Sequence, residues 1–177
     1  ALHHTLALCR SRIGHGVGMN DVELVLRNLP SLPLRYAAQD AAGRAFAAWC
    51  AKQRAFAHVL NPATPGSPGH EHRLAHCTAR AGLVTVEGDL ALLERLVEVD
   101  PRFAPAQVDA FVDALKVFRI GWSWGGPVSL AVPYDPKAIR QRPTPYRGTL
   151  VRFCLGLEAV EDLIADAEQA LASGLGG

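Results

Sequence analysis

A short apolar strand with one arginine inside it is predicted by the stretch Gly148-Thr-Leu-Val-Arg-Phe-Cys-Leu-Gly-Leu-Glu158. Apolar residues flank Arg152 on both sides, so we expect both faces of this strand to be buried. A guanidinium stays charged in proteins and needs a partner when buried, but the nearest acidic residue along the chain is Glu158. Arg152 is therefore either structural, paired with an internal carboxylate, or it grips a bound carboxylate with its fork of donors.

Outward from this strand, the hydrophobic periodicity predicts helices over 1–13, 20–29, 34–54, 90–99, 105–115 and 158–171, and strands over 58–61, 81–87 and 116–122. Asn20 is expected to cap the second helix, and Pro30 and Pro33 to end it. In the third helix an apolar stripe is expected along Leu34, Ala38, Ala41, Ala45 and Trp49. Residues 125–147 hold many prolines and no clear period, which indicates loop. The fold class is therefore α/β or α+β, a small sheet covered by helices and preceded by long helices.

The composition is that of an ordinary globular protein. The chain has 177 residues, of which 49% are hydrophobic and 20% charged, with a formal net charge of +1. This charge gives no reason to expect nucleic acid or a membrane surface as a partner, and no apolar run is long enough to span a bilayer. No signal peptide is visible, and the four cysteines are far apart in the sequence, so we expect free thiols in a reducing cytoplasm.

A second segment of interest is Phe118-Arg-Ile-Gly-Trp-Ser-Trp-Gly-Gly126. The predicted strand ends in Ser123 and a glycine pair, which together offer a hydroxyl and bare backbone N–H groups to an anionic oxygen. Turn chemistry alone also accounts for the glycines. With Arg152 added, the segment favours the binding of a carboxylate.

A cluster of histidines offers another kind of site. His70-Glu-His-Arg-Leu-Ala-His-Cys77 places five potential zinc ligands within eight residues. Since His72 and His76 are four apart, a helix would put them on one face. Solvated histidines are the interpretation we favour, so no metal site is expected.

The segments 118–130 and 148–166 closely resemble the C-terminal domain of the Cys/Met-metabolism family of pyridoxal-phosphate (PLP) enzymes. Further stretches agree in order: Leu26-Arg-Asn-Leu-Pro-Ser-Leu-Pro-Leu-Arg35, Val59-Leu-Asn-Pro-Ala63, Pro68-Gly-His-Glu71 and Gly82-Leu-Val-Thr-Val86. The resemblance covers almost the whole chain and is greatest to the members that cleave cystathionine at its β-carbon.

This resemblance implies a fold-type-I enzyme in which PLP is carried on a lysine of a large domain. It implies that residues 1–33 lead in from that domain and that 34–177 form the C-terminal substrate-side domain, with a mostly antiparallel sheet. Arg152 would grip the substrate α-carboxylate together with the Ser123 hydroxyl and the Trp124 amide, and Trp122 would line the same site. The implied reaction is the α,β-elimination of cystathionine to homocysteine, pyruvate and ammonia by a homo-oligomer, a tetramer, in which the cofactor is the electron sink.

The chain also departs from the family pattern. The cofactor lysine lies in a Ser-x-Thr-Lys setting, whereas Lys52, Lys116 and Lys137 have no such context. We therefore expect a C-terminal part of a longer enzyme whose partner is the missing N-terminal PLP domain, inactive and without covalent cofactor by itself. Residues 88–99 resemble an insertion. The alternatives are a non-catalytic assembly or binding module, and a γ-lyase or γ-synthase of the same family.

Overall fold

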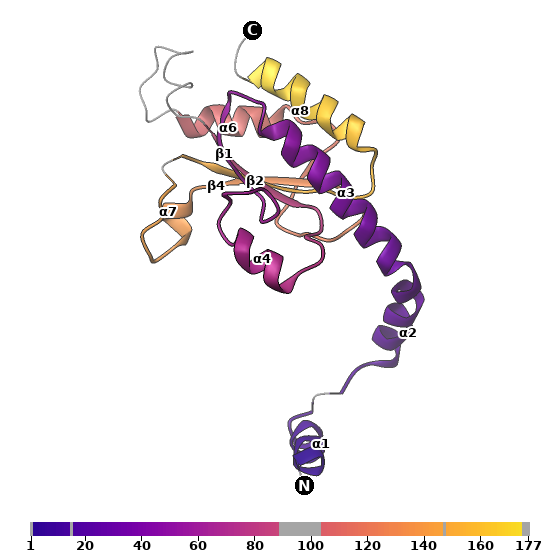
Figure 1. Cartoon of the computed structure of the whole chain (residues 1–177). Helices are drawn as coiled ribbons and strands as arrows, with labels where there is room; N and C mark the ends of the chain where they lie inside the picture. The colour runs from indigo at the N-terminus through magenta and orange to yellow at the C-terminus, as the bar shows by residue number, and fades with distance from the viewer. Residues whose placement is uncertain (1, 15, 89–103, 147, 175–177) are drawn as a thin grey trace. The chain divides into compact units, whose positions relative to one another are not determined.

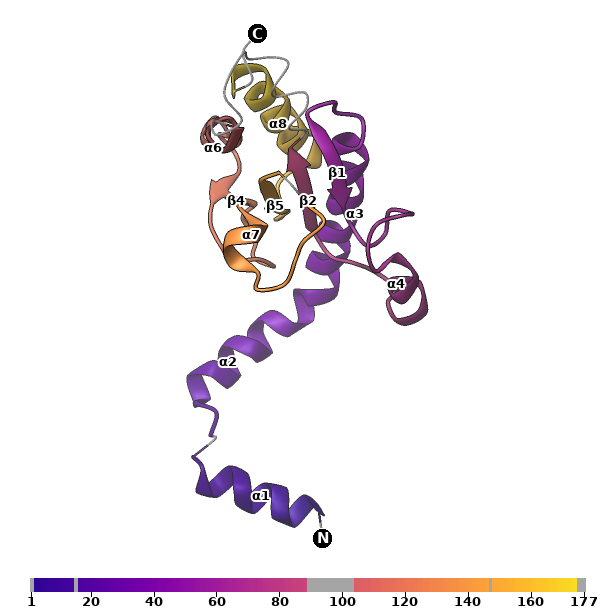
Figure 2. The ribbon, with the colours of Figure 1, turned by 90° about the vertical axis from the view of Figure 1, so that its left-hand side faces the viewer.

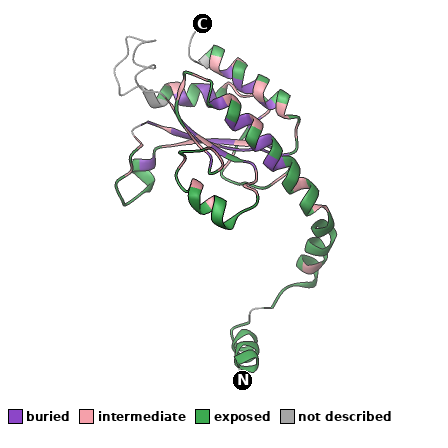
Figure 3. Cartoon of the chain, in the orientation of Figure 1, coloured by how far each residue is buried: buried purple, intermediate pink, exposed green. Residues whose placement is uncertain are grey.

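A computed structural model of the chain describes residues 2–14, 16–88, 104–146 and 148–174. The chain forms two compact units, residues 1–34 and 35–177. The first unit contains α1 (Leu2–Arg12), α2 (Met19–Asn28) and a short 3-10 helix at Leu29–Ser31. Neither α1 nor α2 has a buried residue, and most of their surface is exposed in Figure 3.

Of two expectations about helix ends in the first unit, the one about the N-terminal cap of α2 is wrong and the one about its end is confirmed. The residue that precedes α2 in the extended conformation is Gly18, so Asn20 lies inside the helix and does not cap it. α2 ends at Asn28, just before Pro30, as expected, but the chain stays helical, because a 3-10 turn follows and α3 (Leu32–Cys50) begins immediately afterwards. Each proline falls near the start of a helical segment, where its missing N–H has no partner to lose.

The buried face of α3 differs from the predicted stripe. Its buried residues are Gln39, Asp40, Ala42, Gly43, Phe46, Ala47 and Cys50, whereas Leu34, Ala38 and Ala41 are exposed. Burial of Gln39 and Asp40 is possible because Gln39 Nε2 and the Asp40 carboxylate have hydrogen-bond partners. Gly43 faces the backbone of Ala81, whose carbonyl oxygen would lie 2.9 Å from a Cβ at position 43. The face of α3 is therefore selected by close backbone packing as well as by hydrophobicity.

The second unit contains a five-stranded sheet in the order β1-β2-β5-β4-β3. Its strands are β1 (Phe56–Leu60), β2 (Leu83–Gly88), β3 (Arg119–Ile120), β4 (Leu130–Tyr134) and β5 (Leu150–Cys154). All neighbouring pairs are antiparallel except β3 and β4. The strand with the arginine lies in the middle of the sheet, and the expectation of a small, mostly antiparallel sheet is confirmed.

The region 125–147 is largely loop, as expected, but it also contains two elements that were not predicted. It contains β4, which pairs with the whole of β5, and the short helix α7 (Pro136–Ile139), whose first turn is capped by the Asp135 side chain. Pro133 hid this strand, since proline is rare inside a sheet. The strand predicted over 116–122 is only two residues long. The backbone N–H groups of residues 116–118 donate hydrogen bonds to the Asp166 carboxylate at 2.8 to 3.1 Å and therefore do not pair with a neighbouring strand.

Three helices lie on one side of the sheet and enclose the core: α3, α6 (Ala104–Asp113) and α8 (Val160–Gly174) (Figures 1 and 2). Their apolar residues pack with the inward side chains of the central strands, among them Val84, Val151 and Phe153. The short helix α4 (His70–His76) lies on the other side of the sheet in Figure 1. The predicted helix 90–99 lies outside the described residues, as does nearly all of the proposed insertion. Among the described helices, none has the length and apolar character that a bilayer crossing requires.

Candidate carboxylate-binding site

Arg152 lies at the centre of β5, between β2 and β4. Its Cα is paired with Thr85 on one side and with Val132 on the other. Val151 and Phe153 point into the helix-covered core, so the alternation of a strand sends Arg152 to the opposite face. Arg152 is half-buried there, and its neighbours on the same face, Leu150 and Cys154, are buried, so the expectation that both faces of the strand are buried is confirmed apart from the partial exposure of Arg152.

The segment 121–129 covers this opposite face beside β5. It joins β3 to β4, which are parallel, so the chain must turn out of the sheet and return to run in the same direction. Its backbone contacts two side chains of β5. The Trp122 carbonyl accepts a hydrogen bond from Arg152 Nη2 at 2.7 Å, and the Gly125 N–H lies 3.2 Å from Cys154 Sγ. We call residues 121–129 the crossover loop. Its path brings the two segments singled out in the sequence together.

The guanidinium of Arg152 also contacts two aromatic rings of the crossover loop. Its central carbon lies 5.6 Å from the centroid of the Trp122 ring and 5.5 Å from that of Trp124, both within the range of cation–π attraction. Among the described residues, no carboxylate forms an ion pair with Arg152. Ser123 lies between the two tryptophans and is exposed, and none of the hydrogen bonds of the described residues involves its hydroxyl.

Helix α3 fixes the middle of the crossover loop. The buried Gln39 side chain donates a hydrogen bond from Nε2 to the Gly126 carbonyl oxygen at 2.8 Å. Gly125 has φ +73°, a conformation that suits glycine, and this allows the sharp turn after Trp124. The glycine pair is thus part of a turn whose backbone is held from both α3 and β5.

The far end of the crossover loop is fixed by Glu158, which lies just before α8 and not in its first turn as expected. The Glu158 carboxylate accepts the Ser129 amide at 2.9 Å and the Ser129 hydroxyl at 2.6 Å. The same hydroxyl accepts the Gly156 N–H at 2.8 Å. Burial raises the pKa of Glu158, but the hydrogen bonds from Ser129, together with those from the backbone of Glu158 and Leu157, outweigh it and hold this pKa below its ordinary value.

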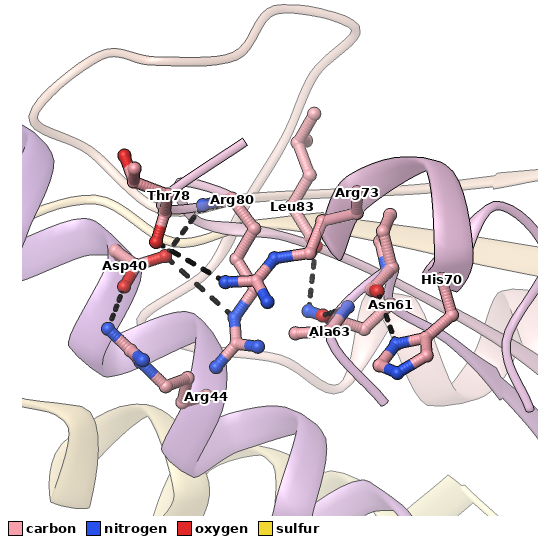
Figure 4. A network of polar contacts seen from close by, with 10 residues as sticks. Asp40, Arg44, Asn61, Ala63, His70, Arg73, Thr78, Arg80 and Leu83 are labelled. Carbon is pink, nitrogen blue, oxygen red and sulfur yellow. Dashed lines mark hydrogen bonds and ion pairs between the residues drawn. The ribbon is translucent and has the colours of Figure 1, made fainter. Parts of the chain in front are cut away.

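A second polar network, centred on Asp40, supports α3 (Figure 4). The buried Asp40 carboxylate pairs with Arg44, accepts the Arg80 N–H at 2.8 Å and lies 3.8 Å from Arg80 Nε. Burial, together with the nearby positive charges of Arg44 and Arg73, lowers the pKa of Arg80 despite Asp40. The sequence interpretation missed Gln39, Asp40, Ser129 and Glu158. Gln39 and Asp40 could have been noticed in the sequence, because they are two adjacent polar residues in an alanine-rich helix.

The histidine cluster does not form a metal site in the described part of the chain. His70–His76 is helical, but its residues are mostly exposed, and His70 Nδ1 lies 2.9 Å from the Pro62 carbonyl oxygen. Within the described ranges, no group of three or more histidine, cysteine or acidic residues is arranged to hold a metal ion. The four cysteines are free thiols; Cys50 and Cys154 are buried, and Cys9 and Cys77 are exposed.

The three lysines lie on other segments than the site. Lys52 follows α3, Lys116 precedes β3 and Lys137 is in α7, whereas the crossover loop and β5 contain no lysine. The chain therefore does not fit the role of holding PLP covalently beside Arg152. What the site offers is an unneutralised guanidinium, a hydroxyl and a turn of backbone amides, a set of donors that suits a carboxylate.

Comparisons with known proteins identify the family of the chain. The family described as "Cys/Met metabolism PLP-dependent enzyme" matches residues 1–172. A cystathionine β-lyase of Salmonella typhimurium is 33% identical over 158 residues, which are 87% of this chain and 37% of the relative. An L-alanine/L-glutamate racemase of Wolbachia pipientis is 30% identical over 90% of the chain.

A solved structure is similar as well. The crystal structure of an apo methionine γ-lyase from Micromonospora echinospora matches 97% of this chain and 42% of its own, with a TM-score of 0.74 and 27% identity. The chain thus spans about two fifths of the length of the relatives it matches. It belongs to the Cys/Met-metabolism family of PLP-dependent enzymes.

Proposed function

We propose that this chain is the substrate-side part of a PLP-dependent carbon–sulfur lyase of the cystathionine β-lyase type. The complete enzyme would convert cystathionine and water to homocysteine, pyruvate and ammonia by α,β-elimination in the cytoplasm, as a homotetramer. Residues 1–33 would lead in from a cofactor domain, and residues 34–177 would form the substrate-side domain. The cystathionine β-lyases among the relatives support the choice of reaction.

The observation that carries this proposal is the unneutralised positive charge of Arg152. Its charge has no acidic partner in the described chain, and its guanidinium lies beside Trp122 and Trp124, the residues on either side of Ser123 in the sequence. An α-carboxylate would accept hydrogen bonds from the guanidinium, the Ser123 hydroxyl and the Trp124 amide, with Trp122 beside it. Charge-assisted bonds of this kind fix a substrate in one orientation at its α-carbon.

The cofactor would have to come from the part of the relatives that this chain does not span. No lysine of the chain is in the site, so we assign the chain no covalent cofactor bond and no proton transfer. Its role is to bind and orient the carboxylate. A γ-elimination is the second candidate, because the similar solved structure is a methionine γ-lyase. A non-catalytic binding module is the third.

A hybrid enzyme tests the proposal. The chain would replace the matching 158 residues of the Salmonella lyase, so that the cofactor lysine comes from the relative. Visible absorbance of bound cofactor would report a folded hybrid, and pyruvate release from cystathionine is the expected activity. Release of α-ketobutyrate from methionine would favour the γ-lyase, and formation of D-alanine from L-alanine a racemase. Bound cofactor with none of these products would favour the binding module.

A further inference from the structure

The way in which Arg152 is held is unusual for a half-buried cation. Most such arginines are oriented by a carboxylate, which also neutralises them. Here one carbonyl oxygen and two indole rings take that place. A carbonyl and a ring face orient a guanidinium but carry no net charge, so the full positive charge remains available to a ligand.

Trp122 is itself supported from the sheet. Its ring centroid lies 6.1 Å from that of Tyr134, at an interplanar angle of 45°. Tyr134 is the last residue of β4 and lies two residues after Val132, the partner of Arg152, so all three side chains share one face of the sheet. The contacts form a series from Tyr134 through Trp122 to Arg152 and on to Trp124, which we call the aromatic ladder.

Burial of the indoles is not the reason for this ladder. Trp122 and Trp124 are 59% and 63% exposed, so neither contributes much to the core. The contact that the two indoles share within the described chain is the one with the Arg152 guanidinium. Their exposure also means that replacing them should leave the fold intact.

We propose that Trp122, Trp124 and Tyr134 are positioning residues that hold the Arg152 guanidinium in place for a carboxylate without neutralising it. This inference rests on the proposed function, since the carboxylate is the one assigned above. It goes beyond that function, because it assigns the aromatic side chains a contact that positions Arg152, in addition to the place of Trp122 beside the substrate. Tyr134 lies outside both sequence segments that indicated the site.

Nuclear magnetic resonance of the ¹⁵N-labelled 177-residue chain tests the ladder directly. The Arg152 Nε–H signal is identified by its loss in Arg152→Lys, and ring currents of the indoles should displace it from the ordinary arginine position. Trp122→Leu and Trp124→Leu should each return it towards that position. Tyr134→Leu should do so more weakly, and Tyr134→Phe, which keeps the ring, should not. Val128→Ala, an exposed change in the same loop, is the matched control.

Titration with propionate then separates the two proposals. We expect propionate to shift the Arg152 signal, and each tryptophan substitution to weaken its binding roughly three-fold, as the loss of one cation–π contact would. If propionate binds equally well in all variants, or the Arg152 signal does not respond to the tryptophan substitutions, the ladder is refuted while carboxylate binding can stand. If the substitutions move the Arg152 signal but propionate does not, the ladder is supported and the carboxylate role is wrong.

Discussion

Phe153 and Arg152 are neighbours in β5, yet their side chains meet opposite environments. Phe153 is fully buried and its ring lies 5.0 Å from those of Phe46 and Phe118. Arg152 faces a loop with two exposed tryptophans. The strand is held by packing at Phe153 and by a few directional contacts at Arg152. Stability should therefore depend on the core face, and ligand binding on the loop face.

The largest effect expected on stability comes from Phe153→Ala. Loss of a fully buried ring and the cavity it leaves should cost about 3–5 kcal/mol in the free energy of unfolding, measured with denaturant. Arg152→Leu is the matched control on the other face of the same strand and should cost less than about 1 kcal/mol. Similar costs for the two changes would abolish the contrast between the faces.

A smaller loss is expected from Glu158→Gln. The carboxylate takes two hydrogen bonds from Ser129, and an amide can replace only part of them, so unfolding should become easier by about 1–2 kcal/mol. Because Glu158 fixes the end of the crossover loop, the Trp122 and Trp124 signals should shift as well. Glu161→Gln, an exposed change in the first turn of α8, should do neither.

Gln39→Leu should have a smaller effect still. The substitution keeps the shape of the side chain but removes the donor to the Gly126 carbonyl, a loss of about 1 kcal/mol. The lost hydrogen bond should loosen the crossover loop, so backbone hydrogen exchange at Gly125 and Gly126 should accelerate more than exchange in β5. Uniform acceleration throughout the second unit would show that Gln39 is only a core residue.

The pH dependence of stability gives the smallest effect. The pKa of Glu158 is lower in the folded chain than its ordinary value of 4.5, so its stabilising contribution is present above pH 4.5 and is lost as the pH falls through the folded value. The difference in unfolding free energy between wild type and Glu158→Gln should therefore shrink as the pH is lowered from 7 to 3. A difference that is constant with pH would mean that the charge of Glu158 is irrelevant.

Sequence patterns predicted β5, α6 and α8 well, because each has a clear apolar period and marked ends. They failed at β4, where Pro133 masks a central strand, and at the inward face of α3, where Gln39 and Asp40 are buried through partners distant in sequence. The site residues Ser123 and Arg152 could be selected by residue type and setting. Their supports could not, since Glu158 and Tyr134 acquire a role only through the fold.

The central claim, that Arg152 binds the substrate carboxylate, is tested most directly by kcat/KM of the hybrid enzyme for cystathionine. Arg152→Leu should lower kcat/KM by at least about 100-fold, as loss of a charge-assisted, two-point contact implies, with cofactor absorbance unchanged. Val128→Ala should leave it within two-fold, roughly the scatter expected of a neutral surface change. A kcat/KM for Arg152→Leu equal to that of the parent hybrid would contradict the account.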